Sequence, residues 1–216
     1  MTFLRRYLTP LNIVLLLLLA AATISGFLLV PPGTSLPIHW GLNGNPNSFQ
    51  PRDRALLIFP AIGVVVSAIL TFVRGLDKPE ASRHVLRIAV SCVLALFLVF
   101  EVATVMIGIG VAVDMTRVVV LGVGALFVVV GNELPKTQPN HVAGIRLPWT
   151  LRDPANWQAT NRLGGILMMI AGAVMMVAGL VMVEAMVRIG VLLGAAVLSL
   201  LIPTIYSWRL SRRRGT

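Results

Sequence analysis

The stretch LNIVLLLLLAAATISGFLLV, residues 11–30, decides the class of this protein. It carries no charged residue, and its length matches the roughly 20 apolar residues that a helix needs to cross the hydrocarbon core of a bilayer. Two arginines precede it, as they would precede a signal peptide core, but Val30-Pro31-Pro32 offers no small-x-small cleavage site. We therefore expect residues 11–30 to be a retained transmembrane helix.

Five further stretches of similar length and composition follow. Together with the first, the predicted spans are 11–30, 55–73, 85–110, 113–130, 163–183 and 187–206. The chain of 216 residues is 57% hydrophobic and 12% charged, with a mean hydropathy of +0.89, whereas a soluble domain has about 25% charged residues. The predicted fold class is all-α, a polytopic integral membrane protein with six transmembrane helices.

The distribution of Lys and Arg predicts the orientation. If the N-terminus is cytoplasmic, the outer segments hold four basic residues, which are Arg52, Arg54, Arg117 and Arg188. The remaining 14 of the 18 Lys and Arg residues, among them Arg5, Arg6 and Lys78, are then cytoplasmic. Cytoplasmic loops carry an excess of positive charge, so both termini are predicted to be cytoplasmic. The net charge of +10 follows from this bias, and the expected partner is the lipid bilayer, with no direct binding of nucleic acid.

Two loops are long, residues 31–54 on the outer side and 131–162 on the cytoplasmic side. Long loops in compact proteins are usually functional or disordered, and these are rich in Trp, His, Asn, Pro and Gly rather than in low-complexity polar residues. We expect both to be ordered. The pattern predicts two units: residues 1–84, a two-helix unit with the outer loop, and residues 85–216, a four-helix unit with the cytoplasmic loop.

The outer loop reads LPIHWGLNGNPNSF over residues 36–49. Its first proline favours extended backbone in the residue before it, and the Asn-Gly and Asn-Pro pairs are turn signals. We expect a short extended arm followed by tight turns, with His39, Trp40 and Gly44 as candidate binding residues. A single His without Cys, Asp or Glu at ligand spacing predicts no metal site.

The cytoplasmic loop combines side-chain amides, two tryptophans and basic residues. Its candidate binding residues are Asn132, Asn140, Arg146, Trp149, Thr150, Trp157, Asn161 and Arg162. Thr150 is the expected N-cap of a short helix that starts at Leu151, with Asp153 at the third helical position. Arg146 is expected to pair with Glu133 or Asp153, or to bind a lipid phosphate.

Glu101 lies well inside the span 85–110. An isolated carboxylate in hydrocarbon costs several kcal/mol or takes up a proton, so a structural carboxyl and a proton or ligand site both stay open. In the span 163–183, Met-Met-x-Ala-Gly occurs at 168–172 and again at 175–179. This repeat places small residues on one seam and predicts close helix packing.

Motifs of common enzymes are missing from the sequence. It contains no zincin motif, no phosphate-binding loop and no Gly-x-Ser-x-Gly elbow. We therefore expect no cofactor, no metal and no catalytic residue.

Both loops resemble sequences of the SdpI family, bacterial membrane proteins typified by an immunity protein against a secreted killing factor. The cytoplasmic stretch fits the family pattern at Gly131, Asn132, Leu134, Lys136, Pro139, Asn140, Gly144, Ile145, Arg146, Pro148, Trp149, Thr150, Leu151, Trp157, Thr160, Arg162 and Gly165. The outer stretch resembles a domain of unknown function that often precedes this signature, and it fits at Pro37, His39, Trp40 and Gly44. Leu147 replaces the usual Thr and Asn161 replaces the usual His. Asn161 can still donate and accept hydrogen bonds.

The resemblance implies a non-enzymatic protein of the bacterial plasma membrane that gives resistance to a secreted peptide toxin. In the typifying member it also implies that the toxin-bound protein sequesters a cytosolic transcriptional repressor, so toxin and repressor are the expected partners. Two alternatives stay open. One is a transporter or exporter of a small amphipathic or lipid-like molecule with Glu101 as its coupling acid. The other is a membrane enzyme at the inner face with His141 and Glu133 as an acid–base pair.

Overall fold

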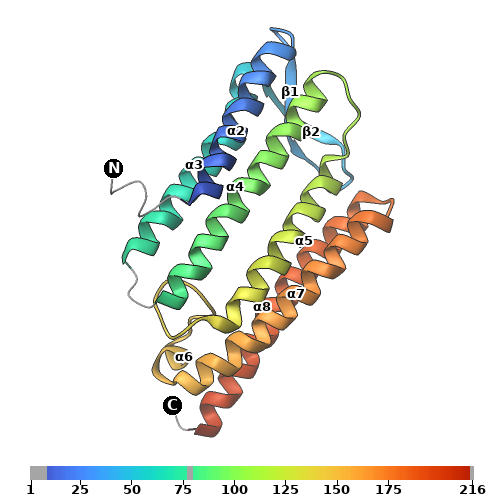
Figure 1. Cartoon of the computed structure of the whole chain (residues 1–216). Helices are drawn as coiled ribbons and strands as arrows, with labels where there is room; N and C mark the ends of the chain where they lie inside the picture. The colour runs from blue at the N-terminus through green and yellow to red at the C-terminus, as the bar shows by residue number, and fades with distance from the viewer. Residues whose placement is uncertain (1–8, 77–79, 215–216) are drawn as a thin grey trace.

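Six long helices dominate the computed structural model, which describes residues 9–76 and 80–214. Each is long and apolar enough to cross a membrane. They are α2 (Pro10–Leu29), α3 (Arg52–Leu76), α4 (Glu80–Gly108), α5 (Met115–Glu133), α7 (Pro154–Val181) and α8 (Ala185–Arg214) (Figure 1). The predicted all-α, six-span membrane fold is confirmed. The orientation in the membrane stays a prediction, and Arg5, Arg6 and Lys78, which contributed to it, lie outside the described residues.

The six helices form two groups of three. In the first group, α2 and α3 pack against α4, and in the second, α5 and α8 pack against α7. Contact between α4 and α5 joins the groups (Figure 1). The predicted division after residue 84 stays a prediction, but the packing associates α4 with the two helices before it.

Glycines allow the backbones of α5 and α7 to touch. A Cβ atom added at Gly124 would lie 2.8 Å from the carbonyl oxygen of Gly172, and one added at Gly131 would lie 2.9 Å from that of Gly165. Real side chains do not fit at such distances, because overpacking forces the helices apart. The close packing predicted from the small residues of the span 163–183 is confirmed.

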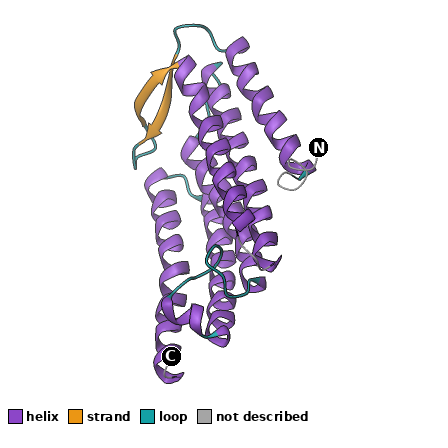
Figure 2. Ribbon diagram, turned by 90° about the vertical axis from the view of Figure 1, so that its left-hand side faces the viewer, coloured by secondary structure: helices purple, strands orange, loops and turns teal. Residues whose placement is uncertain are grey.

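A β-hairpin lies beside the helices at one end of the bundle (Figure 2). Its strands, β1 (Ser35–Trp40) and β2 (Pro46–Pro51), pair antiparallel with an irregular register around His39. The turn between them is closed by hydrogen bonds from the Gly41 N–H to the Asn45 carbonyl and from the Gly44 N–H to the Gly41 carbonyl, both 2.9 Å. The extended arm and the tight turn agree with the sequence, whereas β2 was not predicted because prolines at both of its ends are unusual in strands.

The opposite end of the helices carries the segment between α5 and α7, with the 3-10 helix η1 (Leu134–Lys136) and the short helix α6 (Pro148–Arg152). We call this the loop end and the other the hairpin end. The predicted helix from Leu151 with Thr150 as N-cap is wrong, since α6 starts at Pro148, a residue suited to the first helical position. Asp153 instead caps α7, which starts at Pro154 rather than at residue 163, and its side chain accepts from the Ala155 N–H at 2.9 Å.

Candidate functional site

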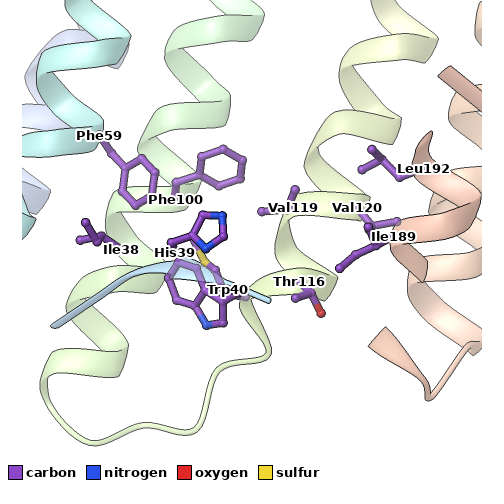
Figure 3. A pocket seen from close by; sticks show the side chains of 11 residues that line it. Ile38, His39, Trp40, Phe59, Phe100, Thr116, Val119, Val120, Ile189 and Leu192 are labelled. Atoms are coloured by element: carbon purple, nitrogen blue, oxygen red, sulfur yellow. The ribbon is translucent and has the colours of Figure 1, made fainter. Parts of the chain in front are cut away.

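An apolar cavity lies at the hairpin end, between the two helix groups. It has a volume of about 320 Å³, and we call it the apolar chamber. β1 contributes Ile38, His39 and Trp40, α3 and α4 contribute Phe59 and Phe100, and α5 and α8 contribute Met115, Thr116, Val119, Val120, Ile189 and Leu192 (Figure 3). Aromatic rings from the first group thus face aliphatic side chains from the second across the chamber.

A second, more polar cavity of about 560 Å³ adjoins the first, and we call it the polar vestibule. Trp40 and Met115 line both cavities. The polar lining of the vestibule comes from the hairpin turn and from the ends of α5 and α8, and consists of Asn43, Asn45, Asp114, Glu184 and Arg188. A ligand that occupied both spaces would place an apolar part in the chamber and a polar part in the vestibule.

Arg188 fixes one wall of the vestibule. Its side chain is 2% exposed and donates from Nη2 to Asp114 Oδ2 at 2.5 Å and to Thr116 Oγ1 at 2.8 Å. Its Nη1 donates to the carbonyls of Met182 and Val183. These bonds tie the start of α8 to the start of α5.

Asp114 is kept ionised by its surroundings. Partial burial pushes the pKa of Asp114 upward, but hydrogen bonds from the Thr116 hydroxyl and the Arg117 N–H, with the charges of Arg188 and Arg117, outweigh that effect. The net result is a pKa below the usual value of 3.8. The Asp114–Arg188 ion pair therefore persists at any physiological pH.

The hairpin tip joins the two helix groups. Gly44, with φ of +82°, lies so close to α8 that an added Cβ would sit 2.7 Å from the Cβ of Ala185. Beside it, His39 Nδ1 is 2.6 Å from Asn47 Oδ1, which links the two strands. Of the predicted outer-loop residues, His39 and Trp40 thus line the chamber and Gly44 lines the vestibule, although sequence reasoning missed Asp114 and the buried position of Arg188.

Four of the predicted cytoplasmic-loop residues are buried and hold the loop in shape; they are Asn140, Thr150, Trp157 and Asn161. Asn140 Oδ1 accepts from the N–H groups of Val142 and Ala143, both at 2.7 Å. Asn161 Oδ1 accepts from the Ile145 N–H at 2.8 Å, and its Nδ2 donates to the Trp157 carbonyl. The amide that replaces the family His is therefore a connector between α7 and the loop.

Three other predicted residues, Asn132, Arg146 and Arg162, are exposed at the loop end. Arg146 donates from Nη1 to the carbonyl of His141, which holds its side chain across the loop. Trp149 is half-buried, so its exposure is intermediate between the buried and the exposed residues. It donates from Nε1 to Ser207 Oγ on α8 at 2.8 Å. The exposed polar side chains are thus presented on a hydrogen-bonded scaffold.

Glu133 has other partners than those predicted for it. Its carboxylate accepts from Lys136 Nζ at 2.7 Å and lies 3.5 Å from Nε2 of His84 on α4. Among the described residues neither Arg146 nor His141 pairs with it, so these two predicted pairings are wrong. His84 is distant in sequence and becomes a neighbour only because α4 packs beside α5.

Glu101 is fully buried on α4 and is not among the lining residues of the chamber or the vestibule. Within residues 9–76 and 80–214, no group of three or more His, Cys, Asp or Glu side chains could hold a metal ion. The intramembrane acid and the hairpin-end cavities are therefore separate features.

Comparison with known proteins agrees with this architecture. The model of the SdpI/YfhL protein family matches residues 136–207, from the loop end into α8. The chain is 24% identical over 173 residues to immunity protein SdpI of Bacillus subtilis (strain 168), an alignment that covers 80% of this chain and 82% of that protein. No solved structure matches the chain. With six helices long and apolar enough to cross a membrane, this chain is a multi-pass membrane protein that is similar to immunity protein SdpI and matches the SdpI/YfhL family over residues 136–207.

Proposed function

We propose that this chain is an immunity protein of the bacterial plasma membrane that protects the cell by binding a secreted peptide toxin at the hairpin end. Its similarity to immunity protein SdpI supports the biological role. The observation that supports this binding site is the apolar chamber with the adjoining polar vestibule, both of which are lined in part by the hairpin. The predicted orientation has the hairpin end outside, where a secreted peptide arrives.

The chamber suits part of an apolar peptide. Its volume of about 320 Å³ falls at the lower end of the range of roughly 300–1,000 Å³ found for ligand pockets. That is room for a small apolar group, not for a whole helix. Apolar rings and aliphatic side chains at its walls favour burial of such a group, while the vestibule offers amide and charged groups for peptide backbone or polar side chains.

The test is survival of a toxin-sensitive bacterium that expresses variants of this chain. Val119→Trp fills the chamber and should abolish protection against a panel of secreted antibacterial peptides. Val174→Trp makes the same change in an exposed position on α7, away from the chamber, and should protect like the wild type. Equal membrane levels are checked by immunoblot. If Val119→Trp protects as well as the wild type, the chamber is not the binding site, and if the wild type itself protects against nothing, the immunity role fails.

A relay to a cytosolic transcriptional repressor is the second part of the proposal. The exposed side chains of Asn132, Arg146 and Arg162 at the loop end would contact this partner, since the predicted orientation faces them to the cytosol. In cells challenged with a toxin, transcription should change with the wild type and not with Arg146→Ala. Arg213→Ala, also at an exposed position in the loop-end half of α8, is the matched control. A response that persists in Arg146→Ala would exclude that side chain as the contact.

Export of a small amphipathic or lipid-like molecule is the second candidate function. The observation that favours it is the buried carboxyl of Glu101 inside α4. Under this alternative, Glu101→Gln should abolish protection, and collapse of the pH gradient should do the same to the wild type. Protection that survives both treatments would leave toxin binding as the function.

A further inference from the structure

Glu101 is a carboxyl group in the membrane without a charged partner. The residue is 0% exposed, and among the described residues no cation pairs with its carboxyl oxygens, which also lack a hydrogen bond of ordinary geometry. An ionised carboxylate in such a site would keep almost its whole desolvation cost, which far exceeds that of the neutral acid. The burial and the missing partners together therefore require an explanation.

The surroundings of Glu101 offer no compensating positive charge. The adjoining helix α2 has no ionisable residue over Pro10–Leu29. Over the described ranges, the Thr23 side chain of α2 is the one hydrogen-bonding neighbour that acts on the carboxyl, but its hydroxyl already donates to the Leu19 carbonyl at 2.9 Å. One hydroxyl that is already engaged cannot replace the hydration shell of a carboxylate.

The charged groups on the other neighbouring elements do not pair with Glu101, and Arg54 on α3 is exposed. On α3, Arg52 pairs with Asp53 at 2.8 Å and donates to the Val30 carbonyl. On β1, His39 is bonded to Asn47. On α5, Arg117 lies 3.6 Å from Asp114. None of these groups is paired with Glu101 within the described part of the chain.

We infer that Glu101 is a proton-binding site within the membrane, occupied while α2 lies against α4. When the O–H bond breaks, the electron pair stays on the carboxylate and the proton passes to water. The charge left behind must then be hydrated. Since the buried side chain contacts no solvent, hydration requires α2 and α4 to separate at this level.

Contacts between α2 and α4 on either side of Glu101 confine the expected separation of the two helices to the level of this residue. Farther along the same interface toward the loop end, Ser91 Oγ donates to Asn12 Oδ1 at 2.6 Å and joins α4 to α2. Toward the hairpin end, a Cβ added at Gly26 would lie 2.9 Å from Val105, so the two helices are in close contact there as well. Glu101 lies between these two contacts. When its carboxyl group is protonated, it carries no charge, and α2 and α4 can stay packed against each other along the whole stretch. This inference goes beyond toxin binding and does not depend on it.

The test uses the full chain in phosphatidylcholine vesicles and two measurements over a pH series. Infrared spectroscopy should show a protonated carboxyl C=O band at neutral pH that is absent in Glu101→Gln and kept in Glu184→Gln, an exposed-carboxyl control. Spin labels at Ile24→Cys and Val102→Cys, exposed positions on α2 and α4, report the helix separation in a Cys92→Ser background. The labels should move apart at the alkaline pH at which the band disappears, and Glu101→Gln should show no such movement.

Three results would overturn the inference. They are a spectrum at neutral pH without a carboxyl band that depends on Glu101, a helix separation that stays constant while the band disappears, and a separation that changes equally in Glu101→Gln. Because Gln has the shape of the neutral acid, this variant keeps the fold and isolates the proton. A toxin-protection assay takes no part in this experiment, so its outcome is independent of the proposed immunity function.

Discussion

At the scale of single residues, Arg188 shows how a buried cation is tolerated at the end of a membrane helix. Its Nη atoms reach four acceptors, of which the Asp114 carboxylate is the charged one. Removing one partner of a buried pair leaves the other charge uncompensated, which costs more than the pair itself contributes. Loss of either partner of the Asp114–Arg188 pair should therefore destabilise the hairpin end of the protein.

Asp114→Asn should lower the free energy of unfolding by about 1–3 kcal/mol, because the amide still accepts a hydrogen bond but carries no charge. Thermal unfolding in detergent measures the effect. Asp53→Asn removes a carboxylate that is 70% exposed from its pair with Arg52 and should change the free energy by no more than about 1 kcal/mol. Equal effects of the two variants would contradict the importance of burial.

Acid should weaken the same ion pair. The folded protein holds the pKa of Asp114 below its usual value of 3.8, so the pair's contribution to stability is complete above that pH. It is lost as the pH falls through the lower pKa of the folded state. The melting temperature of the wild type should therefore drop toward that of Asp114→Asn below about pH 3.8, and a constant difference between the two at all pH values would refute this.

Asn161 is a second residue whose replacement has a defined cost. Asn161→Ala leaves the Ile145 N–H without its acceptor at a part-buried site, and an unsatisfied buried donor costs about 1–3 kcal/mol. Gln138→Ala, an exposed amide in the loop that Asn161 supports, should change stability by less than about 0.5 kcal/mol. Urea unfolding in mixed micelles compares the two, and a larger loss in Gln138→Ala would assign the structural role to the wrong amide.

At the scale of elements, hydropathy alone located the six spans, because in lipid a helix must be apolar over its whole length. The polar segments were harder to predict. Hydropathy predicts residue 163 as the start of α7, whereas the helix starts at Pro154, because its first two turns, PANWQATN, are polar and lie beyond the apolar stretch. Likewise, the Glu133–His84 contact depends on how α4 and α5 pack, which no local pattern encodes.

The contact between α5 and α7 yields a prediction at this scale. Gly172→Val pushes a side chain into the backbone of Gly124, and overpacking of this kind costs about 1–3 kcal/mol. Gly190→Val on α8 is the matched control, because an added Cβ there meets nothing within 4 Å. Thermal unfolding should show a loss for Gly172→Val alone, and tolerance of both changes would mean that α5 and α7 are not held in backbone contact.

At the scale of the whole molecule, the two helix groups meet at both ends of the bundle. At the loop end, Glu133 on α5 faces His84 on α4. At the hairpin end, the tip of a hairpin attached to α3 reaches Ala185 on α8, and the apolar chamber lies beneath it. A ligand in the chamber would therefore contact both groups.

The hairpin tip tests this arrangement. Gly44→Ala places a side chain at φ +82° and drives its Cβ toward Ala185, whereas Gly33→Ala at φ +84° meets nothing within 4 Å. Both changes carry a backbone cost of about 1–2 kcal/mol, so their difference isolates the contact with α8. Hydrogen exchange of the β1 and β2 amides should be faster in Gly44→Ala than in Gly33→Ala, and toxin protection should fall in Gly44→Ala alone. If both variants exchange and protect alike, the hairpin does not need its contact with α8, and the chamber must be closed by the helices without it.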